Sequence, residues 1–132
     1  MVNRELICPQ SIVVVGGSNN IHKPGGRLVR NLLDGKFKGS LYVVNAKETD
    51  VQGLKSYHSV QDIPETEMAI ISIPSKACVE VVDVLAHQKN VKAFIIISAG
   101  FGEETKEGGI LEDKILEIIN EVGASLIGPN CI

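Results

Sequence analysis

The stretch SIVVVGGSNNIHKPGG, residues 11–26, carries the pattern that decides the fold. A β-branched apolar run leads into glycines, then into polar residues, and then into Pro24 and two more glycines. A strand, a glycine turn and a helix in this order are typical of nucleotide binding, because glycine lets backbone N–H groups approach phosphate at a helix N-terminus. The dinucleotide fingerprint, however, requires glycine where this chain has Ser18 and Ile21. The stretch therefore predicts a nucleotide-type crossover whose loop is not the dinucleotide loop.

Short apolar runs alternate with helical patterns along the rest of the chain. Each run is continuous rather than alternating, as expected for parallel strands that are covered on both faces. Helices are predicted at 26–34, after Pro74 with Ser75 as the N-cap, and at about 109–122 with Gly123 as the stop. The sequence thus predicts an α/β fold: a Rossmann-like, doubly wound parallel five-stranded sheet in strand order 3-2-1-4-5, with helices on both faces. The predicted strands are 11–16, 41–45, 68–73, 93–98 and 124–127.

Length, charge and cysteine spacing bound the class of protein. The chain has 132 residues, 44% hydrophobic, with a net charge of −3 and no basic run, which argues against nucleic acid or membrane as partner. The three cysteines lack the spacing of a zinc site or a disulfide framework, and no stretch resembles a signal peptide or a membrane span. We expect a cytoplasmic protein without a metal site. Residues 1–132 are expected to form a single domain cut from a longer multidomain protein.

The loop after the first predicted strand is the first candidate site, because open parallel sheets bind ligands at the carboxyl ends of their strands. Ser18, Asn19 and Asn20 offer hydrogen-bonding side chains. Gly16 opens the turn, and Gly25 opens the next helix with free N–H groups. These residues predict a polar or anionic ligand; the alternative is a glycine-rich turn that only shapes the crossover.

The second predicted strand is followed by Asn45 and Lys47. An NAD-binding domain usually places Asp or Glu here, which accepts hydrogen bonds from the ribose hydroxyls. A lysine instead suits a phosphorylated ribose, as in NADP or coenzyme A. The alternative is a solvated surface lysine.

The remaining strand ends offer weaker signals. Pro74 ends the third strand and Ser75 caps the next helix, so a ligand role for Ser75 would be a second use. Small residues that admit a ligand follow the fourth strand, and two glutamates after them are better explained as a solvated acidic loop than as catalytic carboxylates. The small residues are Ser98, Ala99 and Gly100, and the glutamates are Glu103 and Glu104. Asn130 follows the fifth predicted strand.

Seven ordered motifs resemble one family. The segments LICPQSIVVVGGS, LYVVNAK, GLKSYHSVQDIP, AIISIPS, KAFIIISAGFGE, EGGILE and GPNC are similar to the N-terminal coenzyme A-binding domain of the NDP-forming acyl-CoA synthetases. That family includes ADP-forming acetyl-CoA synthetase and the alpha subunit of succinyl-CoA synthetase. The resemblance implies a domain that binds coenzyme A or acetyl-CoA and works with other domains or subunits of the synthetase.

The resemblance also implies a set of cofactor-binding residues and no catalytic residue. In this family a phosphohistidine in the following domain carries the phosphoryl group, and ATP or ADP binds only in the missing domains. None of His22, His58 and His87 matches that histidine. The acyl substrate and the choice between ADP and GDP are also set outside this fragment. The implied coenzyme A site comprises Gly16, Ser18, Asn19, Asn20, Gly25, Asn45, Lys47, Ile73, Pro74, Ser75, Ser98, Ala99, Gly100 and Asn130.

Two other functions stay open at the level of sequence. One is an NADP-binding oxidoreductase domain, which Lys47 permits but the missing fingerprint glycines disfavour. The other is a coenzyme A-binding regulatory domain fused to a protein acetyltransferase, because similar domains occur in such fusions.

Overall fold

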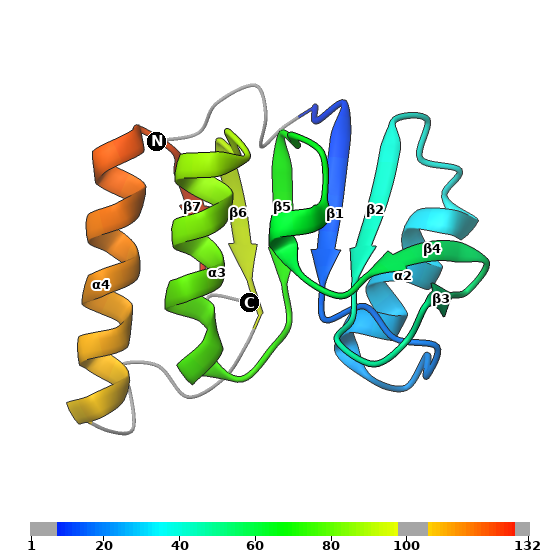
Figure 1. Cartoon of the computed structure of the whole chain (residues 1–132), viewed down its shortest axis with the longest axis horizontal. Coiled ribbons are helices and arrows are strands. Elements are labelled where there is room, and N and C mark those ends of the chain that lie inside the picture. The colour runs from blue at the N-terminus through cyan, green and yellow to red at the C-terminus, as the bar shows by residue number, and fades with distance from the viewer. Residues whose placement is uncertain (1–7, 98–105, 129–132) are drawn as a thin grey trace.

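A computed structural model describes residues 8–97 and 106–128, and these form a mixed sheet with helices on both sides (Figure 1). The architecture confirms the predicted α/β class. The helices are α2 (Pro24–Asp34), α3 (Ser75–Gln88), α4 (Lys106–Val122) and the short 3-10 helix η1 (Val60–Asp62). The strands are β1 (Ser11–Val15), β2 (Ser40–Val44), β3 (Asp50–Val51), β4 (Leu54–Tyr57), β5 (Met68–Ile71), β6 (Ala93–Ile96) and β7 (Ser125–Ile127).

The sheet has seven strands in the order β3-β4-β2-β1-β5-β6-β7. All neighbouring pairs are parallel except the hairpin of β3 and β4. In the central strand β1, Val15 is in register with Val44 of β2 on one side and Ile71 of β5 on the other. Because these strands are parallel, their carboxyl ends meet at one edge of the sheet.

The predicted strand order is wrong in detail. It places residues 68–73 at the outer edge beside the second strand, whereas β5 lies between β1 and β6. All four residues of β5 are buried, which requires a central position. The place beside β2 belongs to β4, a strand that the sequence analysis missed. The five strands β4-β2-β1-β5-β6 lie side by side in the sheet. If β4 is counted as the third strand and β3 is left out, β5 becomes the fourth strand and β6 the fifth, and the order of these five is 3-2-1-4-5.

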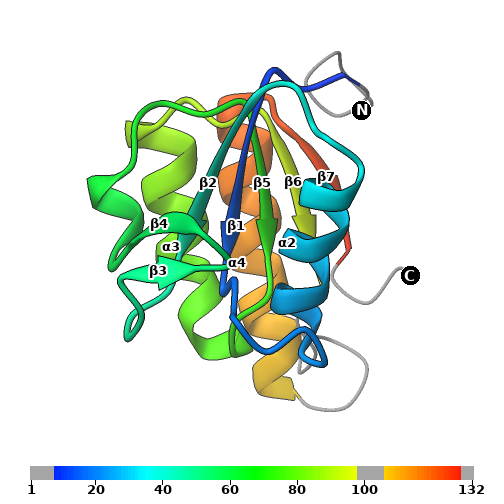
Figure 2. The same cartoon turned by 90° about the vertical axis from the view of Figure 1, so that its right-hand side faces the viewer.

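Alternate residues of β1 enter two separate apolar cores, one on each face of the sheet. Ile12 and Val14 pack with Val29 of α2, and Val13 and Val15 share the second core with residues of α3 and α4. Figure 2 shows α2 on one side of the sheet and α3 on the other. A strand buried on both faces needs a continuous apolar run, which explains the composition of SIVVV.

The helix C-terminal ends agree with the sequence, but the starts differ: α2 begins at Pro24 rather than at residue 26, and α4 begins at Lys106 rather than at about residue 109. Gly123 follows α4 with a φ of 69°, the left-handed conformation in which helices commonly stop, as predicted. Ser75 was predicted as the N-cap of α3, and this is wrong: Pro74 is the N-cap, and no side chain caps the helix. The backbone carbonyl of Pro74 accepts a hydrogen bond from the N–H of Ala77 instead, at 2.9 Å.

His87 connects α3 to α4 on the outside of the molecule. Its Nδ1 lies 2.7 Å from Oδ1 of Asp83 in the same helix, and its Nε2 lies 2.8 Å from Oε1 of Glu121 in α4. A neutral imidazole has only one N–H, so both carboxylates receive a hydrogen bond only when the ring is protonated. The hydrogen bonds to Glu121 and, next, to Asp83 raise the pKa of His87 above its ordinary value.

The His87 contact predicts a pH-dependent stability. Because the pKa is raised in the folded state, the contribution of His87 is fully present below its unfolded pKa and is lost as the pH rises through the folded pKa. The free energy of unfolding of His87→Gln should therefore differ more from that of the parent at pH 5.5 than at pH 8.5. Urea unfolding at both pH values measures this, with Glu121→Gln and Asp83→Asn combined as the control that removes the dependence. A pH-independent difference would contradict the assignment.

Candidate functional site

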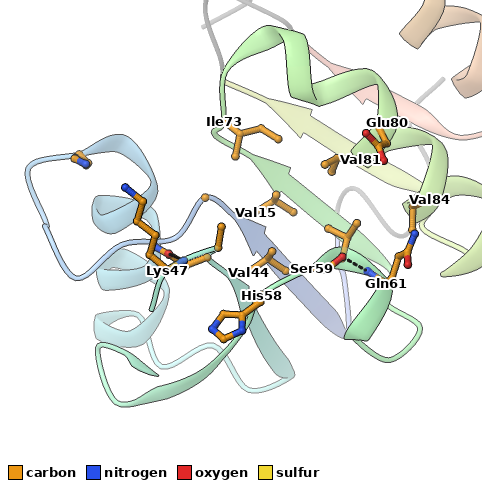
Figure 3. Close-up of a pocket in the computed structure, with 15 residues that line it drawn as sticks. Val15, Val44, Lys47, His58, Ser59, Gln61, Ile73, Glu80, Val81 and Val84 are labelled. Atoms are coloured by element: carbon orange, nitrogen blue, oxygen red, sulfur yellow. Dashed lines mark hydrogen bonds between the residues drawn. The ribbon is translucent and has the colours of Figure 1, made fainter. Parts of the chain in front are cut away.

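A cavity of about 440 Å³ opens at the carboxyl edge of the sheet (Figure 3). Its walls come from the ends of β1, β2 and β4, from η1, from one face of α3, and from two single residues, Lys23 before α2 and Ile73 after β5. The chain leaves β1 through α2 on one face of the sheet and leaves β5 through α3 on the other. The cavity therefore lies where the strand order reverses, which is where open α/β sheets bind their ligands.

The cavity combines an apolar floor with charged ends. The floor is made by the side chains of Val15, Val44 and Val81 together with Ile73. Lys47 lies on the β2 side and Glu80 on the α3 side of this floor in Figure 3. Such a surface suits a ligand with a flat apolar part and an anionic group at one end.

Asn45 shapes the basic end of the cavity. Its Nδ2 donates to the carbonyl of Gly17 at 2.7 Å, and its Oδ1 accepts from the N–H of Lys47 at 2.8 Å and of Glu48 at 3.0 Å. One side chain thus fixes both the end of β1 and the turn after β2. The predicted site residues Gly16, Asn45, Lys47 and Ile73 are all brought together on the cavity wall.

The backbone of β1 and the backbone of α2 approach each other without room for a side chain. Gly16 has a φ of 91°, and a Cβ placed on Gly25 would overlap the carbonyl of Gly16. The first turn of α2 begins at this contact. Pro24 has no N–H, and the N–H groups of Gly25 and Gly26 have no acceptor within the helix. Among the described residues, no acceptor is found for the N–H groups of Ser18 and Asn19 either.

The side chains of the predicted polar loop mostly bind the loop itself. Ser18 Oγ accepts from the N–H of Asn20 at 3.0 Å, and Asn20 Oδ1 accepts from the N–H of His22 at 2.9 Å. The amide of Asn19 binds the β3–β4 turn, through Asp50 and Gln52. Within the described part of the chain, these three loop residues do not line the cavity. Their contact with a ligand stays a prediction.

The other predicted site residues lie at or beyond the α3 side. Pro74 and Ser75 begin α3 next to Ile73 and, among the described residues, are not part of the cavity wall. Ser98, Ala99, Gly100 and Asn130 lie outside the described residues, as do Glu103 and Glu104.

Several residues of the cavity were missed in the sequence. His58, Ser59 and Gln61 follow β4, and Glu80 comes from α3. The only available signal was the motif GLKSYHSVQDIP, whose strand character was not recognised. Gln52, which binds the loop after β1, was missed for the same reason.

The described residues hold neither a metal cluster nor a membrane-spanning helix. No cluster of three metal-ligating side chains occurs in residues 8–97 and 106–128. No helix in the same residues combines the length and apolarity that crossing a bilayer requires. A second concavity of about 650 Å³ lies between α3 and α4, lined by Lys76, Glu80 and His87 among others; it shares Glu80 with the first cavity and includes no described residue of the loop after β1.

Comparison with known proteins decides the family. The profile of the CoA binding domain matches residues 10–132. The chain belongs to this CoA-binding family. It is 41% identical over 128 residues to an ADP-forming acetate–CoA ligase of Archaeoglobus fulgidus, covering 96% of this chain and 19% of the relative. It is also 41% identical over 125 residues to the alpha subunit of an ADP-forming acetate–CoA ligase of Pyrococcus furiosus, covering 94% of this chain and 27% of the relative.

A solved structure shares the fold of this CoA-binding domain. The acetyl-coenzyme A synthetase 1 of Ca. Korarchaeum cryptofilum, in complex with phosphate and ADP, superposes with a TM-score of 0.86 at 34% identity. The match covers 98% of this chain and 28% of the synthetase. The resemblance read from the sequence motifs is therefore confirmed. The chain spans between 19% and 28% of the length of these three proteins.

The contact between Gly16 and Gly25 predicts a strong effect of one methyl group. Gly25→Ala should destabilise the CoA-binding domain by about 2 kcal/mol or more, because the new Cβ overlaps a backbone carbonyl that cannot move alone. Gly109→Ala is the matched control: this glycine lies in α4 with open space around it, so alanine should be neutral or stabilising by up to about 1 kcal/mol. Thermal and urea unfolding of both variants measure the difference. Equal stability of the two variants would show that the close approach is absent.

Proposed function

We propose that this domain binds coenzyme A at the carboxyl edge of its sheet and presents it to an ADP-forming acyl-CoA ligase. The observation that carries the proposal is the cavity at the strand ends, with Lys47 at one end of an apolar floor, in a chain of the CoA-binding family. The named relatives are CoA ligases, which supports the ligase over a regulatory domain of an acetyltransferase.

The chemistry of the cavity fits the nucleotide half of coenzyme A. The valine and isoleucine floor suits the adenine ring, and the ammonium group of Lys47 suits the phosphate on the ribose. The diphosphate is proposed to lie near the loop after β1, where the N–H groups of Ser18, Asn19, Gly25 and Gly26 have no backbone acceptor in the described parts of the chain. Asn20 and Gly25 are proposed to lie in this diphosphate-binding region as well.

The pantetheine arm is proposed to leave the cavity along the start of α3. Pro74 and Ser75 flank that route next to Ile73. Ser98, Ala99, Gly100 and Asn130 are proposed to lie nearer the thiol end. This chain would then hold the coenzyme and orient its sulfur, and supply no group that reacts.

The proposed reaction joins an acid, coenzyme A and ATP into acyl-CoA, ADP and phosphate, or runs in reverse. It needs an acyl phosphate and a phosphohistidine, which we place outside residues 1–132, together with the ATP or ADP site. In this proposal residues 1–132 are one domain of a longer protein, and its partners are the other domains or subunits of the ligase.

Calorimetric titration of the 132-residue chain tests the proposal. Coenzyme A should bind, dephospho-coenzyme A should bind more weakly, and NADPH should bind weakest, because the cavity faces a loop without the dinucleotide glycines. Tighter binding of NADPH than of coenzyme A would favour the oxidoreductase function and contradict the proposal. So would the absence of binding by coenzyme A.

Lys47→Ala refines the test. Loss of a partly exposed, charge-assisted contact to the ribose phosphate should weaken coenzyme A by about 1 kcal/mol, roughly fivefold, and leave dephospho-coenzyme A nearly unchanged. Lys38→Ala is the matched control, because Lys38 is exposed and precedes β2 at the opposite edge of the sheet. Equal losses for both ligands would place Lys47 away from that phosphate.

A further inference from the structure

The turn between β3 and β4 reaches back to the loop that follows β1. Nε2 of Gln52 donates to the carbonyl of Ser18 at 2.8 Å and to the carbonyl of Gly26 at 2.9 Å. One amide group therefore joins the start of the loop to the first turn of α2. The two ends of the segment 18–26 are therefore held together by the side chain of Gln52.

A second amide locks the same turn in place from the loop side. Nδ2 of Asn19 donates to the carbonyl of Asp50 at 2.9 Å, and Oδ1 of Asn19 accepts from the N–H of Gln52 at 2.7 Å. Each side chain thus binds the backbone that carries the other. We call these four hydrogen bonds the Asn19–Gln52 clamp.

Gln52 is an unusual residue for its position in the hairpin turn. Gln52 has a φ of 52°, a left-handed conformation that glycine adopts more easily than glutamine. Its Oε1 is also buried and has no hydrogen-bond partner among the described residues, which is unfavourable. Gln52 and Gly53, with φ of 52° and 89°, are the two loop residues between the paired Val51 and Leu54, so the hairpin turn itself requires the positive φ of Gln52. The hairpin does not require the buried Oε1, which belongs to an amide group whose Nε2 binds two loop carbonyls.

The backbone of the loop after β1 is also confined by close contacts with the first turn of α2. A Cβ on Gly26 would overlap the carbonyl of Asn20, and a Cβ on Gly25 would overlap that of Gly16. The loop and the first turn of α2 therefore pack backbone against backbone, and the clamp closes them from the outer side.

We propose that Gln52, with Asn19, is a positioning residue that holds the loop after β1 in its ligand-binding conformation before coenzyme A arrives. The proposal rests on the proposed function, since it assumes that this loop meets the coenzyme. If the loop is already ordered in the free protein, binding coenzyme A costs less conformational entropy. The clamp therefore raises the affinity without contacting the ligand. It also gives the β3–β4 hairpin a role in binding.

Gln52→Met tests the proposal in the 132-residue chain, because methionine keeps the length of the side chain and removes both donors. We expect about tenfold weaker binding of coenzyme A by calorimetry, together with faster amide hydrogen exchange at residues 17–26 in the free protein. Exchange in β1 and β5 should not change. Gln88→Met is the matched control, because Gln88 is exposed at the end of α3, and its affinity should equal that of the parent.

Gln52→Glu gives a second readout, because protonation of its side chain restores a donor within a single variant. An ionised carboxylate facing two carbonyls cannot donate, whereas the protonated acid supplies one donor. The affinity of Gln52→Glu relative to the parent should therefore recover as the pH falls from 8 to 5. This comparison stays informative if Gln52→Met proves too unstable to titrate.

The outcomes separate the two proposals. Unchanged affinity in Gln52→Met with faster exchange in the loop would overturn the clamp as a positioning device and leave the coenzyme A site intact. A pH-independent defect in Gln52→Glu would overturn it as well. Failure of the parent chain to bind coenzyme A would overturn the proposed function, and the role of the clamp with it.

Discussion

The close approach of Gly16 and Gly25 is the constraint on which the arrangement of this domain depends. The end of β1 and the beginning of α2 meet backbone to backbone, because a Cβ on Gly25 would overlap the carbonyl of Gly16. On its other side Gly16 lies against the carbonyl of Ser72, which a Cβ on Gly16 would overlap. The contact between Gly16 and Gly25 fixes the direction in which the helix leaves the sheet. It also confines the intervening polar residues to a short loop at the carboxyl edge, with free N–H groups where a phosphate can be met.

Amide side chains then convert this loop into a defined surface. Asn45 ties the loop to the turn that carries Lys47, and the Asn19–Gln52 clamp ties it to the β3–β4 hairpin. Three chain segments that are distant in sequence thus share one edge. Asparagine and glutamine suit this task because each carries donors and an acceptor in one planar group and brings no charge that would compete with an anionic ligand.

The sequence could predict those features that depend on local pattern. Continuous apolar runs identified five strands, and the residues at or just after the predicted strand ends included four that do line the cavity, among them Asn45 and Lys47. The predictions that failed concern features that depend on tertiary contacts. β4 is short and half polar because it lies near the edge of the sheet, so LKSY carries no strand signal, and without it β5 was placed at the wrong position. The role of Gln52 could not be predicted either, because the residues that it binds, Ser18 and Gly26, lie far from it in the sequence.

The central claim is that coenzyme A occupies the cavity formed by the ends of β1, β2 and β4 and by α3. Titration of the 15N-labelled chain with coenzyme A, followed by amide chemical shifts, tests it most directly. The account predicts the largest shifts at Gly16, Lys47, Ser59 and Ile73, with small shifts along the concavity between α3 and α4. Shifts centred on His87 and Lys114, with the carboxyl edge unchanged, would contradict it.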